Sequence, residues 1–356
     1  MLLVDKSSFP RGKACGGCLG SSAVASLGSI GLGDIPGRLG EKLERFELAA
    51  GTARAALRVC GGVAMPRERL DAEMIGAAVE AGAEFLPATV GALHCENSAE
   101  VVVALRPATD PGSEFGKSAA VSSLVIAADG LSGTSLVNHP EFAASSNESS
   151  LMGVSGTLGD ADWCDRRGTI FMTCGVGGYV GAVRFIDGHL HVAAALDPGF
   201  VRSRGGPTGA VNEILASAGM PLFDVPATFR WRGAPPLTRQ RALIARGRVF
   251  VAGDAAGYVE PFTGEGMGWA IDSGIALAPL AIKKLHRAEF DAAGAWIERH
   301  SRIVGRRQRV CALLAACLKR PRLTRCAVRL LGFLPVGAWP LVRSVQRTAC
   351  TADPAL

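Results

Sequence analysis

The most informative stretch of the chain is Val249-Phe-Val-Ala-Gly-Asp254, followed by Ala255-Ala-Gly-Tyr-Val-Glu-Pro-Phe-Thr-Gly-Glu-Gly-Met-Gly268. Its apolar run ends at Gly253 and Asp254 and predicts a buried strand with a carboxylate at its carboxyl end, where it can accept a hydrogen bond from a sugar-like hydroxyl. The small residues that follow let backbone N–H groups approach a phosphate or an aromatic ring at the start of a helix. The stretch therefore predicts a site for a nucleotide-type cofactor.

Two further stretches end in acids in the same way. Leu2-Leu-Val-Asp5 predicts a short strand before the loop Phe9-Pro-Arg-Gly-Lys-Ala-Cys-Gly-Gly17, and Ser122-Ser-Leu-Val-Ile-Ala-Ala-Asp-Gly130 predicts a second buried strand. In nucleotide-binding folds a strand-terminal acid holds a ribose, about twenty residues after the first phosphate-binding glycines. Because the sequence lacks such glycines before Asp5, we expect the first strand and its Gly-x-Gly-x-x-Gly turn to lie upstream of Met1.

In this order the three stretches resemble the FAD-dependent oxidoreductases, and within them the geranylgeranyl reductases, whose neighbours are the flavin aromatic hydroxylases and flavin halogenases. The resemblance covers residues 1–290. It implies an α/β fold: a FAD/NAD(P)-binding Rossmann-like three-layer domain with an inserted antiparallel β-sheet substrate domain. It also implies FAD as cofactor and NAD(P)H as electron donor. The implied reaction is reduction or hydroxylation of a small apolar substrate that is isoprenoid, lipid-like or alkyl-aromatic.

The same resemblance assigns residues to the cofactor. Asp254 would contact the ribitol, and the turn Gly264–Met267 would border the isoalloxazine ring. Asp5 would occupy the position of the acid that binds the adenosine ribose. Arg67, at the start of a predicted helix, matches an arginine that reaches the cofactor; the alternative is a surface arginine. The sequence identifies no catalytic residue and no metal ligands. The full predicted cofactor-binding set is Asp5, Arg11, Lys13, Cys15, Gly16, Arg67, Asp129, Gly130, Gly253, Asp254, Pro261, Gly264, Glu265, Gly266 and Met267.

The patterning predicts three parts. Residues 1–45, 63–150 and 233–295 would form a discontinuous, N-terminally truncated FAD-binding domain; residues 46–62 and 151–232 a substrate-side β-sheet; and residues 296–356 a basic, apolar helical tail. In the second part, turn signals between short apolar runs predict hairpins. Geranylgeranyl reductases carry a Tyr-x-Trp-x-Phe-Pro pattern in this region, whereas here Gly178-Tyr179 is followed by Val-Gly-Ala-Val, and the halogenase pattern Trp-x-Trp-x-Ile-Pro is also missing.

Two smaller clusters invite a functional interpretation. His189 and His191 would share one face of a strand, either as exposed residues or as a general acid for alkene reduction. Cys15-x-x-Cys18 lacks the further ligands that a metal site needs, so we expect these cysteines to pack in the flavin loop rather than form a functional dithiol.

Composition excludes several classes. The chain has 356 residues, 48% of them apolar, and ten irregularly spaced cysteines. Without a secretory leader or a long apolar span, this composition predicts reduced thiols in a cytoplasmic protein. The net charge of +6 comes from the tail, since Arg299 to Arg347 contains twelve Lys or Arg and no acid. The remaining chain is net acidic, so we expect no nucleic-acid partner.

The tail leaves two alternatives open. Its arginines and apolar runs fit peripheral contact with a membrane interface. They equally fit a pair of helices that cap the substrate cavity and keep solvated arginines on the outside.

A different class of function also stays open. Without the phosphate-binding turn the chain could be a flavin-free remnant that binds a lipid or a protein partner through the old substrate pocket.

Overall fold

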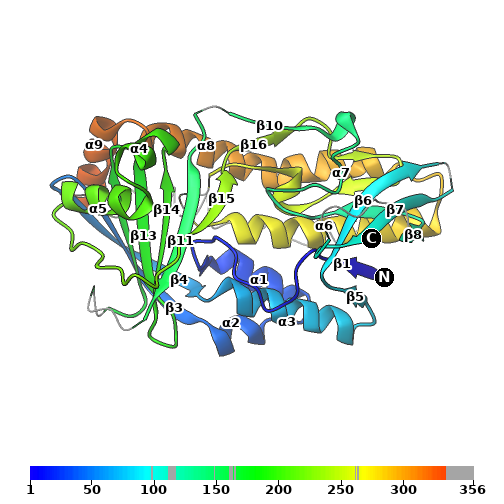
Figure 1. Cartoon of the computed structure of the whole chain (residues 1–356), viewed down its shortest axis with the longest axis horizontal. Coiled ribbons are helices and arrows are strands. Elements are labelled where there is room, and N and C mark those ends of the chain that lie inside the picture. The colour runs from blue at the N-terminus through cyan, green and yellow to red at the C-terminus, as the bar shows by residue number, and fades with distance from the viewer. Residues whose placement is uncertain are drawn as a thin grey trace.

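The computed structural model describes residues 1–97, 99–110, 118–147, 149–159, 163, 166–260, 262 and 264–333. The molecule is elongated, with a large sheet in one half and smaller sheets and long helices in the other (Figure 1).

The large sheet has eight strands in the order β15-β11-β14-β13-β12-β3-β4-β2. Neighbouring strands are antiparallel except for β12 and β3, which run parallel. The inserted sheet predicted as antiparallel is therefore mixed, because a strand from the N-terminal part joins it. The strands are β2 (Cys18–Leu19), β3 (Glu41–Ala50), β4 (Ala53–Ala64), β11 (Met152–Leu158), β12 (Thr169–Gly175), β13 (Gly178–Arg184), β14 (Leu190–Leu196) and β15 (Arg232–Pro236).

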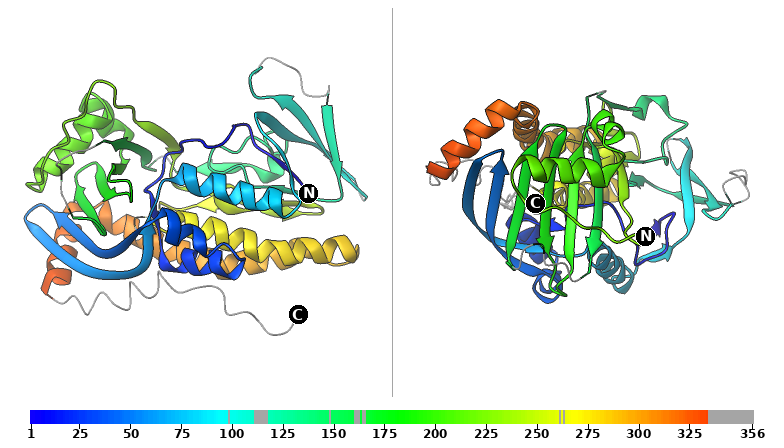
Figure 2. Two further views of the ribbon diagram at one scale, coloured as in Figure 1. Left: turned by 90° about the horizontal axis from the view of Figure 1, so that it is seen from below. Right: turned by 60° about the vertical axis from the view of Figure 1, so that its left-hand side comes forward.

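The two faces of this sheet bury different side chains, because successive residues of a strand point to opposite faces. Val180 and Ala182 pack in a cluster with Ile214 of α5 (Pro207–Ser217), which crosses one face beside α4 (Pro198–Ser203) (Figure 2). Tyr179 packs in another cluster with Cys174. That second face looks toward the C-terminal helices.

The cofactor half contains two parallel strand pairs. β1 (Leu2–Val4) pairs with β5 (Glu84–Leu86), and β9 (Val125–Ala127) pairs with β18 (Val249–Val251), which also carries the antiparallel β17 (Ala245–Arg246). All three residues of β18 are fully buried, as its continuous apolar run predicts. The other strands are β6 (Thr89–Glu96), β7 (Val101–Pro107) and β8 (Ser118–Ser122) in one sheet, and β10 (Ala144–Ser146), β16 (Arg239–Arg241) and β19 (Gly257–Tyr258) in another.

Helices complete the layers. α1 and α6 cross closely, since a Cβ at Gly268 would lie only 3.2 Å from the Ala23 Cβ. The bounds are α1 (Ser21–Ser29), α2 (Asp34–Leu39), α3 (Arg67–Glu80), α6 (Gly266–His286), α7 (Ala292–His300), α8 (Arg306–Leu318) and α9 (Pro321–Phe333), with short 3-10 turns at Pro140–Phe142 and at Gly253–Ala256 and a π-turn at Ser301–Gly305.

Two boundaries of the predicted parts are corrected by these elements. β3 runs through the boundary at 45/46, and α7 runs through the boundary at 295/296. Trp296 is fully buried, packs in the same core as β18, and donates from Nε1 to the Val251 carbonyl at 3.0 Å. The tail therefore begins inside the core of the cofactor half. Among the described helices, none has the length and apolar character needed to cross a bilayer.

Candidate functional site

Four segments bring charged side chains to one place. Lys13 lies in the loop after β1, Arg67 begins α3, and Asp254 lies in the 3-10 turn after β18; the charges of all three act on one another. The loop after β9 closes the group, because a Cβ at Gly130 would lie 3.3 Å from the Lys13 Nζ. Since these strands end at the same side of the fold, predicted residues far apart in sequence become neighbours.

Burial sets the electrostatics of this cluster. Burial, and then the Arg67 charge, lower the pKa of Lys13. Burial raises the pKa of the Asp254 carboxyl, although Lys13 and Arg67 oppose that rise. Arg67 also loses solvent, but its ion pair with Asp71 one helical turn away raises its pKa overall. The cluster thus places two cations, Lys13 and Arg67, beside two carboxylates, Asp71 and Asp254.

Asp254 retains free acceptor capacity. The residue is only half-buried, and within the described part of the chain its carboxylate accepts no hydrogen bond. Gly253 before it has φ of +60°, which glycine adopts without strain, and its N–H donates to the Ser273 Oγ at 2.9 Å. Asp254 thus follows a backbone turn that glycine favours, and its carboxylate keeps its acceptor capacity for a ligand.

Asp5 and Arg11 form a pair at the start of the same loop. Asp5 accepts from the Ser7 N–H at 2.8 Å, and its other oxygen lies 3.5 Å from Arg11 Nη2. The buried Arg11 Nε has no hydrogen-bond partner in the described residues. Asp129 instead braces its own turn, accepting from the Ser135 N–H at 2.8 Å. The Arg11 Nε of this pair is thus available to donate to a ligand, whereas the Asp129 carboxylate already accepts one hydrogen bond.

The predicted turn Gly264–Met267 is placed mostly by internal contacts. The Glu265 carboxylate is buried and lies 2.8 Å from Arg307 Nη2, and Met267 packs in a core cluster beside Cys15. The side chains of Glu265 and Met267 thus face protein, so the predicted contact of this turn with a flavin would be made by its backbone. Gly264 and Gly266 lie at the start of α6, Gly16 has open space around it, and Pro261 lies outside the described residues.

The two histidines do not share a strand face. β14 begins at Leu190, so His189 stays in the exposed turn, 3.0 Å from Asp187. His191 is buried, with Nε2 2.7 Å from the Cys15 carbonyl and Nδ1 3.0 Å from the Thr157 Oγ1. A carbonyl only accepts, so Nε2 carries the proton and Nδ1 accepts from the threonine. Burial lowers the pKa of His191, and the neutral ring ties the sheet to the Cys15 loop.

The cysteine pair has a similar packing role. Burial, and then the neighbouring Cys15, raise the pKa of Cys18 to about 12, so its thiol stays protonated at neutral pH. The Cys15 Sγ accepts from the Gly17 N–H at 3.4 Å.

One buried acidic residue, Glu260, is absent from the set of residues predicted from the sequence. Glu260 is 2% exposed and accepts a hydrogen bond from Tyr179 across the gap between β13 and the cofactor turn. Burial raises the pKa of Glu260 to about 6, although the bond from Tyr179 opposes the rise. The Tyr179 ring packs edge to face on Phe262 at 5.0 Å, and Phe262 in turn packs on Phe46 at 6.4 Å. The only signal in the sequence was an acid within an apolar stretch.

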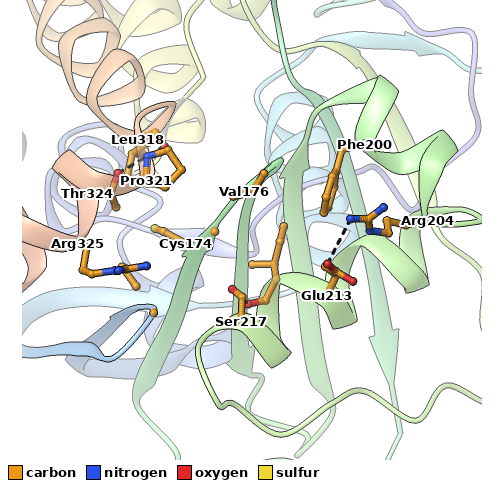
Figure 3. Close-up of a pocket in the computed structure, with 14 residues that line it drawn as sticks. Cys174, Val176, Phe200, Arg204, Glu213, Ser217, Leu318, Pro321, Thr324 and Arg325 are labelled. Atoms are coloured by element: carbon orange, nitrogen blue, oxygen red, sulfur yellow. Dashed lines mark hydrogen bonds and ion pairs between the residues drawn. The ribbon is translucent and has the colours of Figure 1, made fainter.

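A cavity of about 280 Å³ lies at the ends of β3 and β12 (Figure 3). Residues of α4 and α5 line one side of it, and residues of α8 and α9 line the other. Cys174 lines it and also packs in the cluster that contains Tyr179, so the cavity shares a wall with the Glu260 pair. The lining residues are Ala50, Gly51, Cys174, Gly175, Val176, Phe200, Arg204, Glu213, Ile214, Ser217, Leu318, Pro321, Thr324 and Arg325.

Residues 2–289 match the family described as FAD binding domain, and the chain belongs to this family. Its structure is similar to that of p-nitrophenol 4-monooxygenase PnpA from Pseudomonas putida DLL-E4, with 15% identity, a TM-score of 0.74, and coverage of 96% of this chain and 90% of that one. Halogenase PltM, solved with phloroglucinol and FAD, gives 13% identity, a TM-score of 0.72, and coverage of 97% and 80%.

The flavin-dependent halogenase CmlS gives 19% identity and a TM-score of 0.66. The match covers 87% of this chain but only 58% of the halogenase, so the chain spans less than two thirds of that protein. Among curated proteins, none matches this chain significantly. At these identities the structural likeness establishes the fold.

The donors and acceptors of the charged cluster fit FAD. The unengaged Asp254 carboxylate suits a ribitol hydroxyl, and the cationic side chains of Arg11, Lys13 and Arg67 suit a pyrophosphate. The positive-φ glycines at 253 and 264 give a backbone to which a planar ring system can come close.

Proposed function

We propose that this protein is an NAD(P)H-driven, FAD-dependent oxidoreductase that inserts oxygen into an apolar, aromatic or lipid-like substrate. One observation carries the proposal. Asp254 lies in the charged cluster with Lys13 and Arg67, and a few residues further along the chain Glu260 and Phe262 contact Tyr179 in an apolar, acid-containing cluster. A single segment therefore joins a site suited to FAD with a site suited to an apolar reactant.

The residues divide the work between these two sites. Asp254 would hold the ribitol, while Lys13 and Arg67 would offset cofactor charge. When bound, FAD supplies the two-electron redox chemistry. Phe46, Tyr179 and Phe262 would exclude water and orient the substrate by ring packing. Glu260 would hold or accept a proton through its bond with the Tyr179 hydroxyl, since a group with a pKa of about 6 changes charge near neutral pH.

The aromatic character of the second cluster favours hydroxylation. One of the similar structures is a p-nitrophenol 4-monooxygenase, whose name describes the oxygenation of an aromatic compound.

Alkene reduction, as in the geranylgeranyl reductases, is the second candidate. It is supported by the sequence motifs and by the Glu260–Tyr179 pair, which could deliver the proton that a reduction of a double bond consumes. The replacement of the reductase pattern by Val180-Gly-Ala-Val183 weighs against an isoprenoid substrate.

Two successive measurements test the proposal. The absorption spectrum of the purified protein, before and after addition of FAD, should show the blue and near-ultraviolet bands of bound flavin. Oxidation of NADH and NADPH is then followed together with oxygen uptake in the presence of aromatic and polyprenyl compounds. Oxygen uptake matched to product supports hydroxylation, whereas oxygen-independent product supports reduction. A protein that stays colourless with FAD would support the flavin-free binding protein instead.

A further inference from the structure

The last described helix, α9, divides its surface into three strips. Its inner strip packs on the large sheet: Thr324 and Val328, one helical turn apart, are buried, and Val328 joins the cluster that contains Tyr179. This packing agrees with the capping alternative for the tail. It leaves the rest of the helix facing outward at the end of the molecule (Figure 1).

A second strip is apolar and exposed. Leu323 is 49% exposed, Leu330 61% and Phe333 83%. Leu323 and Leu330 are seven residues apart, about two helical turns, so they lie on one side of the helix. The exposed Cys326 and Ala327 lie between them on that side. Apolar side chains thus form a continuous outer strip instead of being scattered singly.

A third strip is basic and borders the apolar one. Arg322, Arg325 and Arg329 are exposed and follow each other at helical spacing. In the described part of the chain none of them forms an ion pair with a carboxylate, whereas Arg38 and Arg166 elsewhere on the surface lie 2.7 Å from acids. From Arg299 to Phe333 the sequence holds ten Lys or Arg and no Asp or Glu.

We propose that the outer face of α9 binds the headgroup region of an anionic lipid bilayer. Leu323, Leu330 and Phe333 would enter the acyl boundary, and the arginine strip would contact the lipid phosphates. At 13 residues the helix is about 20 Å long, shorter than the hydrocarbon core of about 30 Å, so it lies in the interface and does not span it. Charge complementarity selects this partner, because an ordinary protein surface carries both signs.

The cavity in Figure 3 lies next to this face, since Pro321, Thr324 and Arg325 of α9 line it. An apolar reactant dissolved in the bilayer would meet the cavity at the point of contact. That consequence rests on the proposed function, but the membrane contact itself does not.

Vesicle co-sedimentation of the full chain tests the proposal without any enzyme assay. Vesicles of phosphatidylcholine alone are compared with vesicles that contain phosphatidylglycerol, at low and high salt. We expect the protein to bind the anionic vesicles, with an affinity that falls as the salt concentration rises. Its affinity for the neutral vesicles should be lower by about tenfold or more.

Two triple variants separate the strips. The change Leu323→Ser, Leu330→Ser, Phe333→Ser should weaken binding to anionic vesicles by about tenfold or more. The change Arg322→Gln, Arg325→Gln, Arg329→Gln should remove the preference for anionic vesicles. The changed residues are all exposed, so the variants should unfold at the wild-type temperature, which the melting curve checks.

Matched controls alter the same kinds of residue elsewhere. Ile282 and Leu285 on α6 are 55% and 54% exposed, and replacing both with Ser should leave vesicle binding unchanged. The charge control replaces three exposed arginines distant in sequence, Arg202, Arg230 and Arg287, with Gln. Equal losses in variant and control, no vesicle binding by the wild type, or a concentration-dependent dimer that the serine variant abolishes would each overturn the proposal, the last by assigning the face to a second copy of the chain.

Discussion

Arg307 Nη2 lies 2.8 Å from the Glu265 carboxylate, and Arg307 Nη1 lies 2.6 Å from Asp272, with all three side chains buried. This contact joins the first turn of α8 to the turn that the sequence assigns to the cofactor. Asp272 also accepts from the Ser26 hydroxyl at 2.5 Å, so α1, α6 and α8 meet in one buried polar network. The helix α8 is therefore anchored in the cofactor half, whereas α9 packs on the large sheet.

Arg307→Met should strongly destabilise the fold. Removing the guanidinium leaves two carboxylates buried without a counter-charge, which typically costs about 3–5 kcal/mol. Urea unfolding monitored by tryptophan fluorescence measures the loss. The control is Arg302→Met, since Arg302 pairs with Glu298 on the exposed surface and should change stability by less than about 1 kcal/mol. Equal stability of the two variants would refute the structural role of Arg307.

Asp254→Asn should weaken FAD binding. The neutral amide keeps the shape of the side chain but loses a charge-assisted acceptor, worth about 1.5–3 kcal/mol, or roughly 10- to 100-fold in Kd. Titration of flavin fluorescence measures Kd. The exposed Glu73→Gln, whose carboxylate is bound by Arg38, serves as control and should leave Kd unchanged. An unaltered Kd in the Asp254 variant would place the ribitol elsewhere.

Glu260→Gln should change how stability depends on pH. The folded pKa of about 6 exceeds the ordinary value of 4.5, so the folded state binds the proton more tightly than the unfolded state. This stabilisation is complete below pH 4.5 and is lost as pH rises through 6; it amounts to about 2 kcal/mol.

The variant cannot ionise, so between pH 4.5 and 7 its unfolding free energy should fall less than that of the wild type. Using the difference between the two proteins cancels the other titrating groups, including His300, whose pKa burial lowers to about 4. Glu298→Gln on the surface should follow the wild type. Parallel pH curves for the Glu260 variant and the wild type would contradict the burial of the Glu260 carboxyl, which is the cause of its raised pKa.

His191→Phe should loosen the Cys15 loop. The phenyl ring preserves the stacking on Phe185 but removes the bonds to the Cys15 carbonyl and to Thr157, and leaving a buried carbonyl unpaired costs about 1–3 kcal/mol. Amide hydrogen exchange of the loop and thermal unfolding would both report it. The exposed His189→Phe is the matched control. Unchanged protection in the His191 variant would argue against the loop anchor.

Local sequence patterns were sufficient to predict individual strands and helices. The apolar run before Gly253 predicted β18, and Pro66 before an amphipathic segment predicted α3, which runs from Arg67 to Glu80. The placement of Asp254 at the end of β18 followed from the same pattern. Strand and helix periods depend on neighbouring residues, so they can be read without the fold.

Contacts between distant segments were decided by the tertiary structure alone. The parallel pairing of β3 with β12, the bond between Tyr179 and Glu260, and the burial of Arg307 against Glu265 join residues 42 to 124 positions apart. Glu260 and Arg307 look like ordinary surface charges in the sequence, because burial and partners come from the way sheets and helices pack. Sequence patterns thus predicted β18, α3 and the acids that follow the strands, because these features depend on neighbouring residues. The packing of sheets and helices decided which charges are buried and which are paired.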